Sequence, residues 1–443
     1  MEVGTLTLVL LSAAALALAA FCAVRPHTGI GLVVLTFLVA PLFPTDDLGW
    51  LFYGFGIFTM LVLLGWLYRL SRSAAPFRSI DSCDGIAPML KAWLVLCLAC
   101  LPVSLMFNTG TIGDRLYFYL KALLPFLYLL MFFVVRAIPF TANQVQRILD
   151  CLLSVGIVFA VITFAIYAAT GLRVTFLYTP LAFPMIALAA NVAFARMLLA
   201  RSRAAVLAWG LLTSTLTFAV LLTFTKAQMI ALAAGLALIA ALICRHSASH
   251  AAQRITAFLA ISAVAALGLA LFASAQTGGD LSFSEMVSIR MNDESSTGAR
   301  VSEWQAALGE FAQSPLFGKG IGHQLERDVM GESLTAAYVH NQIAYTAMTT
   351  GIAGLIIYVG LIYNWTRLVR RFDQADPALA GTLATVHGCV LTLWVYALMF
   401  ATFGLIQHNL LLGLFLGLAA VMTPRQLPQA ASSPQFLTAV REA

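Results

Sequence analysis

Three polar clusters in the second half of the chain combine residue types and spacings that could do chemistry. The first is Gly298-Ala-Arg300-Val-Ser-Glu-Trp304, in which an arginine stands one helical turn ahead of a tryptophan. A guanidinium group can hold a phosphate through two parallel hydrogen bonds and keeps its charge at any pH. Taken alone, the same pair is also typical of an arginine and a tryptophan at a membrane interface.

The second cluster is a run of alternate glycines, Pro315-Leu-Phe-Gly318-Lys-Gly320-Ile-Gly322. Glycines let the backbone turn tightly and bring its amides close to a ligand. Since no β-strand is expected before them, a dinucleotide-binding fold is not implied. A plain flexible turn stays open as the alternative.

The third cluster is His340-Asn341, followed after nine residues by Gly351-Ile-Ala-Gly354. The histidine stands where a polar segment becomes an apolar one, at or near the N-terminus of a predicted helix. The positive end of a helix disfavours an imidazolium ion, so His340 is expected to be neutral and able to act as a base. The same exposed amides would bind a phosphate. The glycine pair favours close packing against a neighbouring helix.

Further cations stand where predicted helices end. They are Lys226 in the short turn Thr223-Phe-Thr-Lys226, and Arg115 and Lys121. Charges this close to lipid either bind a ligand or extend to the interface. These three residues are therefore candidate phosphate-binding groups.

The elements that must position these residues are helices that cross a membrane. Of the 443 residues, 61% are hydrophobic and 10% are charged, with a mean hydropathy of +0.92. The apolar residues fall in blocks of about 17 to 23, the length that spans a bilayer as a helix. Because the blocks show no period-2 alternation, the fold class is all-α, a polytopic membrane protein. The net charge of +6 comes mostly from basic residues that flank the blocks, which predicts no nucleic-acid partner.

Thirteen candidate spans can be drawn, and about twelve are expected because the second is short. The first is taken as a retained span and not as a signal peptide. Seven cysteines, an odd number, imply no disulfide framework. The candidates are 5–24, 29–44, 50–68, 87–107, 117–138, 150–171, 176–198, 204–223, 227–244, 255–273, 343–364, 383–402 and 405–422.

The positive-inside rule places four basic clusters in the cytoplasm, around Arg72, Arg201, Arg245 and Arg370. The segment 274–342 then faces outward, and the side of the N-terminus stays open. The predicted organisation is N-terminal membrane helices over 1–273, one large periplasmic loop over 274–342, C-terminal membrane helices over 343–422 and a disordered cytoplasmic tail over 423–443.

An amphipathic surface helix is predicted within this loop. Its apolar positions are Val301, Trp304, Leu308 and Phe311, and it should end before Pro315.

Taken in order, the motifs G-x-R-x3-W, P-x-x-G-x-G-x-G and H-N-x9-G-x-x-G over 298–354 resemble the C-terminal half of the O-antigen ligase and O-antigen polymerase superfamily. The resemblance implies a GT-C-like architecture of about twelve transmembrane helices with short helices in the loop. It implies an active site on the periplasmic face of a bacterial inner membrane. It also implies transfer of a polysaccharide from undecaprenyl diphosphate to lipid A-core, with no metal and no other cofactor.

By position, Arg300 resembles the family's loop arginine and His340 its essential histidine. Lys226 stands where members usually have an arginine, and a lysine cannot make the same two-pronged contact. We therefore expect His340 to deprotonate a sugar hydroxyl that displaces the diphosphate with inversion. Arg300, helped by Arg290, Lys226 or Arg115, would bind the diphosphate. Further expected contacts to the substrates are Lys121, Asn341, Trp304, Gly318, Gly320 and Gly322.

The expected partners are the lipid-linked donor, the lipid A-core acceptor and membrane lipids, and the expected state is a monomer. Within the superfamily, an O-antigen polymerase or a protein O-oligosaccharyltransferase stays open. A transporter of lipid-linked glycans, which is a different class of protein, is a further alternative. Transporters usually contain internal repeats, and none is visible in this sequence.

Other interpretations of the loop residues are also open. The loop carboxylates, Glu303 and Glu310 among them, are interpreted as a solvated face and not as a catalytic pair. His323 is interpreted as a solvated loop histidine or a second base, and His408-Asn409 as a coincidence. A zinc site through His323 and His340 would need a third ligand.

Overall fold

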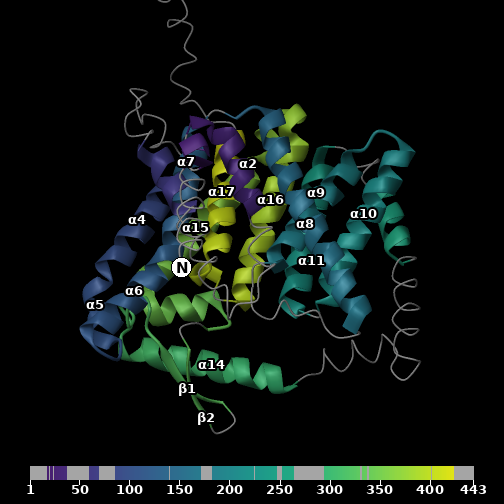
Figure 1. Cartoon of the computed structure of the whole chain (residues 1–443). Helices are drawn as coiled ribbons and strands as arrows, with labels where there is room; N and C mark the ends of the chain where they lie inside the picture. Colours follow the sequence, from purple (N-terminus) through teal and green to yellow (C-terminus); the bar gives the residue numbers. More distant parts are fainter. Residues whose placement is uncertain are drawn as a thin grey trace, which may run out of the picture.

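The computed structural model describes residues 17–36, 59–68, 85–170, 182–246, 252–263 and 294–423, except positions 19, 23, 139, 224, 330, 331, 337, 338 and 401. Arg290 and the tail 423–443, apart from its first residue, lie outside the described residues, as do parts of the predicted spans 5–24, 29–44, 50–68 and 255–273. The described part is a bundle of helices (Figure 1). Its elements are α2 (Pro26–Thr36), α4 (Ile86–Ala99), α5 (Leu101–Phe107), α6 (Ile112–Leu127), η3 (Tyr128–Leu130), α7 (Met131–Ala137), α8 (Ala142–Thr170), α9 (Ala182–Leu199), α10 (Arg203–Leu222), α11 (Lys226–His246), α14 (Glu294–Gln313), β1 (Leu325–Val329), β2 (Glu332–Ala336), α15 (Gln342–Arg370), η4 (Phe372–Gln374), α16 (Pro377–Met399), η5 (Thr402–Gly404) and α17 (Ile406–Met422).

Six of the described helices are long and apolar enough to cross a membrane. A seventh span is possible through α4 and α5, which meet at an angle of 42°. Shorter apolar helices add to these, among them Met185–Leu199 and Ile406–Met422. The prediction of a polytopic helical membrane protein is therefore confirmed, and the total of about twelve spans stays a prediction.

The helices run up and down, so their connections gather at two ends of the bundle (Figure 1). One end carries α14, and we call it the α14 end. The turns between α5 and α6 and between α10 and α11 lie there too. Three of the predicted basic clusters lie at the opposite end, around Arg201, Arg245 and Arg370. This segregation agrees with the alternation expected from the sequence.

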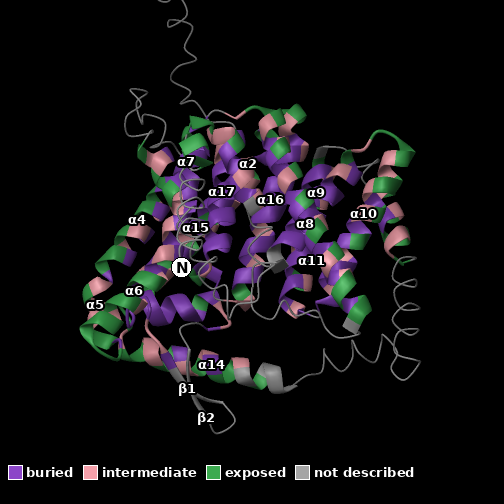
Figure 2. Cartoon of the chain, in the orientation of Figure 1, coloured by how far each residue is buried: buried purple, intermediate pink, exposed green. Residues whose placement is uncertain are grey.

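The most deeply buried helices are α9 and α17, and most of α16 in the centre of the bundle is buried too (Figure 2). Apolar side chains on the outer helices are exposed instead, as Val95 is on α4, Leu207 on α10 and Ile356 on α15. In a membrane protein the solvent for such side chains is lipid, so exposed apolar faces are expected on the outside of the bundle.

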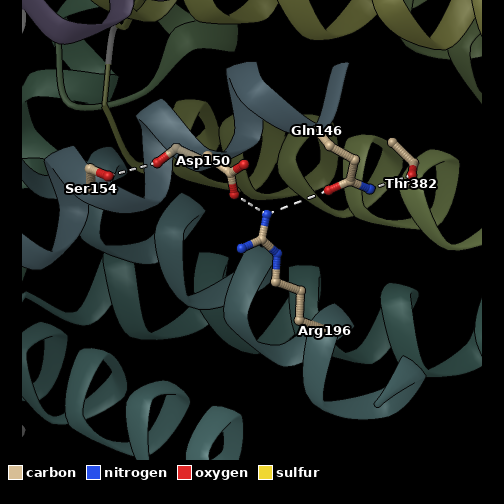
Figure 3. A network of polar contacts seen from close by, with 5 residues as sticks. All are labelled: Gln146, Asp150, Ser154, Arg196 and Thr382. Atoms are coloured by element: carbon tan, nitrogen blue, oxygen red, sulfur yellow. Dashed lines mark hydrogen bonds and ion pairs between the residues drawn. The ribbon is translucent and has the colours of Figure 1, made fainter. Parts of the chain in front are cut away.

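A polar network fastens three helices together at the end away from α14 (Figure 3). Arg196 of α9 donates to the carboxylate of Asp150 and, at 3.4 Å, to the side-chain oxygen of Gln146, both on α8. Gln146 in turn donates to the hydroxyl of Thr382 on α16 at 2.6 Å. The arginine also lies 5.0 Å from the ring centroid of Trp209 on α10. These contacts join α8, α9, α10 and α16 at the end of the bundle opposite α14.

The surface helix predicted in the large loop is present as α14 and ends before Pro315, as expected. Its buried face is different from the predicted one. Val301 and Leu308 are exposed, whereas Glu303 and Ala307 are buried. The prediction followed the apolar residues alone, but α14 packs on the bundle with a face that carries charged side chains.

A two-stranded antiparallel hairpin follows α14, with β1 paired to β2 from Leu325 opposite Ala336 to Val329 opposite Glu332. The sequence predicted no strands, so this short hairpin is an addition to a fold that is otherwise helical within the described residues. Its strands are five residues each and lie at the α14 end, outside the helix bundle (Figure 1).

Helix α15 is broken at Gly351, whose backbone is non-helical (φ 65°, ψ −157°). The glycine turn 315–320 docks at the break and takes up the backbone groups that the break leaves open. A backbone polar group inside a membrane protein needs such a partner. The four bonds run from Lys319 N–H to Met348 O (2.7 Å), Gly320 N–H to Thr349 O (2.9 Å), Ile352 N–H to Pro315 O (2.8 Å) and Ala353 N–H to Leu316 O (3.3 Å).

Candidate active site

The site forms where α14 crosses the start of α15. Asn341 is the N-cap of α15, and its side-chain oxygen accepts from the N–H groups of Ile343 (2.8 Å) and Ala344 (3.0 Å). His340 directly precedes this cap, so the predicted position of the histidine at a helix N-terminus is confirmed. Trp304 of α14 donates its indole N–H to the carbonyl oxygen of His340 at 3.2 Å. Asn341 thus fixes the start of α15, and His340 is held in place by α14.

The ring of His340 is paired with a carboxylate. Its Nδ1 lies 2.7 Å from Oε2 of Glu303, and its backbone N–H donates to the same oxygen at 3.2 Å. The Glu303 side chain is 5% exposed and that of His340 is 21% exposed. An ionised carboxylate only accepts, so beside an ionised Glu303 a neutral ring carries its proton on Nδ1 and its lone pair on Nε2. This geometry is compatible with a base acting through Nε2.

Arg300 and His340 share Phe400 as a neighbour. The guanidinium carbon is 5.9 Å from the Phe400 ring centroid, and the His340 ring meets Phe400 edge-on at 5.2 Å. Phe400 follows α16 and stacks on Tyr396. The structure therefore places the predicted base and the predicted phosphate-binding arginine around one aromatic ring.

Lys226 starts α11 at the same end of the bundle. The residue after it, Ala227, packs with Ala231 against Tyr396, in a cluster that includes Phe400. Helix α11 therefore begins next to the end of α16 that carries Tyr396 and Phe400. Lys226 is half-buried there.

Two other predicted cations have different surroundings. Arg115 donates to the carbonyl oxygens of Gly110 (3.0 Å) and Leu105 (2.7 Å), so it closes the turn between α5 and α6. Lys121 is exposed on α6 and lies 5.8 Å from the ring centroid of Tyr117. The described contacts do not join either of them to His340, and their role in binding stays a prediction.

The three alternate glycines serve the packing of the turn. All have positive φ, and an added Cβ at each would meet backbone atoms of another segment. Gly318 lies against Met348, Gly320 against Ser104 and Gly322 against Phe118. Because the N–H of Gly320 donates to Thr349 and that of Gly318 to Ser314, these two amides are used inside the protein. A contact of the glycines with a ligand stays a prediction.

His323 is largely shielded from solvent, so its interpretation as a solvated loop residue is wrong. Its side chain is 12% exposed, and Nε2 lies 3.5 Å from Oε2 of Glu310. Lys319 reaches the same carboxylate at 3.4 Å and donates to Gln313 at 2.7 Å. Burial lowers the pKa of His323, and the nearby Glu310 opposes that shift only in part. This second cluster lies two turns further along α14 than Glu303.

His408 and Asn409 repeat the dipeptide of the site but not its geometry. Both are buried at the start of α17. Asn409 donates to the carbonyl oxygens of Phe403 (2.7 Å) and Pro125 (2.9 Å), which holds the α16–α17 connection. Among the described residues, no group of three or more His, Cys, Asp or Glu side chains is arranged to hold a metal ion.

Sequence reasoning missed Glu303 and Phe400. Glu303 had one usable signal, since it is three residues after Arg300 and so lies on the same face of the helix. Phe400 is sixty residues from His340, and nothing in the local sequence connects the two.

The fold and the site define a class: a polytopic helical membrane protein in which a carboxylate-paired histidine and an arginine meet at one end of the bundle. Residues 210–359 match the family model of O-antigen ligases, which supports the predicted resemblance to the O-antigen ligase superfamily. The matched range contains Lys226, Arg300, Glu303 and His340. A comparison with curated proteins finds no match.

Proposed function

We propose that this protein is an O-antigen ligase, an inverting glycosyltransferase of the bacterial inner membrane that works on the periplasmic face. Its donor would be a polysaccharide on undecaprenyl diphosphate and its acceptor a sugar of lipid A-core. The observation that carries the proposal is that Arg300 and His340, both within the matched range, lie against the same ring of Phe400.

His340 would act as the general base. Its Nε2 takes the proton as the O–H bond of the acceptor sugar breaks, and the oxygen attacks the anomeric carbon from the face opposite the diphosphate. The bond from this carbon to the diphosphate oxygen breaks, and undecaprenyl diphosphate leaves with the electron pair. The proton then passes from Nε2 to solvent. A positioned base of this kind contributes about 10² to 10⁴ in rate.

Arg300 would stabilise the charge that develops on the leaving diphosphate, with Lys226 as a second cation at the start of α11. Fixed cations at a developing charge are effective because they need no reorganisation during the reaction. The N-terminus of α15 would contribute in the same direction, although its first amides are already capped by Asn341.

Transfer by the purified protein tests this proposal. The assay follows movement of glycan from undecaprenyl diphosphate to lipid A-core, with and without a chelator. The proposal expects product in both conditions, and loss of product with the chelator would contradict the metal-free scheme. Deletion of the gene separates ligase from polymerase, because loss of a polymerase leaves single repeat units on lipid A-core and loss of a ligase leaves none.

A further inference from the structure

We propose that Glu303 is a positioning residue for His340, holding the ring proton on Nδ1 and turning Nε2 toward the acceptor hydroxyl. This inference rests on the proposed function, since it assigns a role within the same site. It gives α14 a part in the reaction beyond carrying Arg300.

The contacts show how completely α14 fixes this histidine. Oε2 of Glu303 receives the backbone N–H at 3.2 Å and lies 2.7 Å from Nδ1. The next residue, Trp304, donates to the carbonyl oxygen at 3.2 Å. The backbone N–H, the backbone carbonyl oxygen and the ring Nδ1 of His340 therefore all contact neighbouring residues of one helix, which fixes the orientation of the ring.

The negative charge of Glu303 would also stabilise a positively charged His340 ring. His340 stands at the N-terminus of α15, where the helix dipole opposes a positive ring. When Nε2 takes the hydroxyl proton the ring becomes positive, and the charge of the buried Glu303 offsets both the ring and the dipole. Glu303 itself takes no proton, because the Nδ1–H bond stays intact.

Glu310 provides an internal comparison on the same helix, seven residues further on. It too faces a histidine, but at 3.5 Å from Nε2 of His323, and Lys319 lies 3.4 Å from its carboxylate. The charge of Glu310 thus has a cation beside it, and its distance to the ring is long for a hydrogen bond. Replacing each glutamate by glutamine therefore separates two effects. A change in the position of His340 should follow only from the Glu303 variant, whereas a general loosening of α14 should follow from both.

The test compares Glu303→Gln, Glu303→Asp and Glu310→Gln in the full-length protein with the transfer assay above. Glutamine keeps the size and removes the charge. Partners that orient a functional imidazole are typically worth about 10- to 100-fold. We expect Glu303→Gln to lower kcat by that factor with little change in KM for the donor. Glu303→Asp should keep more of kcat than Glu303→Gln, and Glu310→Gln should keep the wild-type kcat.

A spectroscopic measurement separates positioning from folding. Nitrogen chemical shifts of the imidazole rings report which nitrogen carries the proton, and the His340 signals among the seven histidines are assigned by their absence in His340→Gln. We expect an Nδ1–H ring in the wild type and a shift toward Nε2–H in Glu303→Gln. Wild-type kcat in Glu303→Gln, an unchanged tautomer, or an equal loss in Glu310→Gln would overturn the inference. Wild-type transfer by His340→Ala would instead remove the proposed function.

Discussion

The backbone N–H of Lys319 donates to the carbonyl oxygen of Met348 at 2.7 Å, in the position that Ile352 would occupy in an unbroken α15. Gly320 replaces Ala353 in the same way at Thr349. Two helical hydrogen bonds are thereby exchanged for four bonds between the glycine turn and the two halves of α15. The glycine turn is consequently joined to α15 by backbone hydrogen bonds. Because α14 directly precedes this turn, the same bonds hold the C-terminal end of α14 at the bundle.

Gly351→Ala should destabilise this junction. An added Cβ would meet the carbonyl of Leu316 at 2.5 Å, and the φ of 65° is unfavourable for alanine. Residues held in such regions cost about 1 to 3 kcal/mol each. We expect a lower thermal unfolding temperature in detergent. Gly309→Ala is the control, because Gly309 is helical with no atom within 4 Å of an added Cβ, and there alanine should stabilise by about 0.5 to 1 kcal/mol. Equal shifts in both variants would contradict this account of the break.

Asn341 should tolerate serine. Its structural role is to cap α15, and serine caps about as well, whereas loss of a cap typically costs about 1 kcal/mol. We expect Asn341→Ser to keep most of the transfer rate and the unfolding temperature, and Asn341→Ala to lose stability. If Asn341→Ser unfolds normally but transfers no glycan, the side chain binds substrate in addition to capping.

The sequence was informative about the membrane helices because their signal is local. A span such as 343–364 is predicted from its own hydropathy. The break inside it is not local: Gly351 and Gly354 are typical of helix packing, and only the glycine turn some thirty residues earlier explains Gly351. The predicted span 343–364 therefore lies within α15, while the break at Gly351 was missed.

The same distinction applies to the site. His340, Arg300 and Lys226 were predicted from residue types at helix ends and from a resemblance, and the structure brings them to one end of the bundle. Glu303 was assigned to a solvated face because its burial depends on α14 packing with its charged side inward. An amphipathic pattern based on Val301 and Leu308 could not predict that orientation.

Lys226 should be replaceable by arginine. The proposed task of this residue is to supply positive charge to the diphosphate, and a guanidinium makes a two-pronged contact that lysine cannot. We expect Lys226→Arg to transfer at least as fast as the wild type and Lys226→Ala to lose about tenfold or more. Arg245→Ala is the control, since Arg245 is exposed at the opposite end of the bundle. A rate in Lys226→Ala that equals the control would remove Lys226 from the site.

His323 should make stability depend on pH. Burial lowers its pKa in the folded protein below the ordinary value of 6.5. The unfolded chain then binds a proton that the folded protein excludes, so stability falls as the pH falls through 6.5 toward the folded pKa. We expect the unfolding temperature to decrease between pH 7.5 and 5.5, and His323→Gln to show a smaller decrease. Since Glu310 and Lys319 face this ring, Glu310→Gln should increase the sensitivity to acid. The same slope in His323→Gln and the wild type would assign the effect to other groups.

The central claim is that His340 is the base of a glycosyl transfer, and single-turnover transfer by His340→Ala tests it most directly. The preformed complex of protein and undecaprenyl-diphosphate glycan is mixed with lipid A-core, and the rate of the chemical step is followed. The account predicts a rate about 10² to 10⁴ lower than that of the wild type, with donor binding and unfolding temperature preserved. A rate equal to that of the wild type would contradict it.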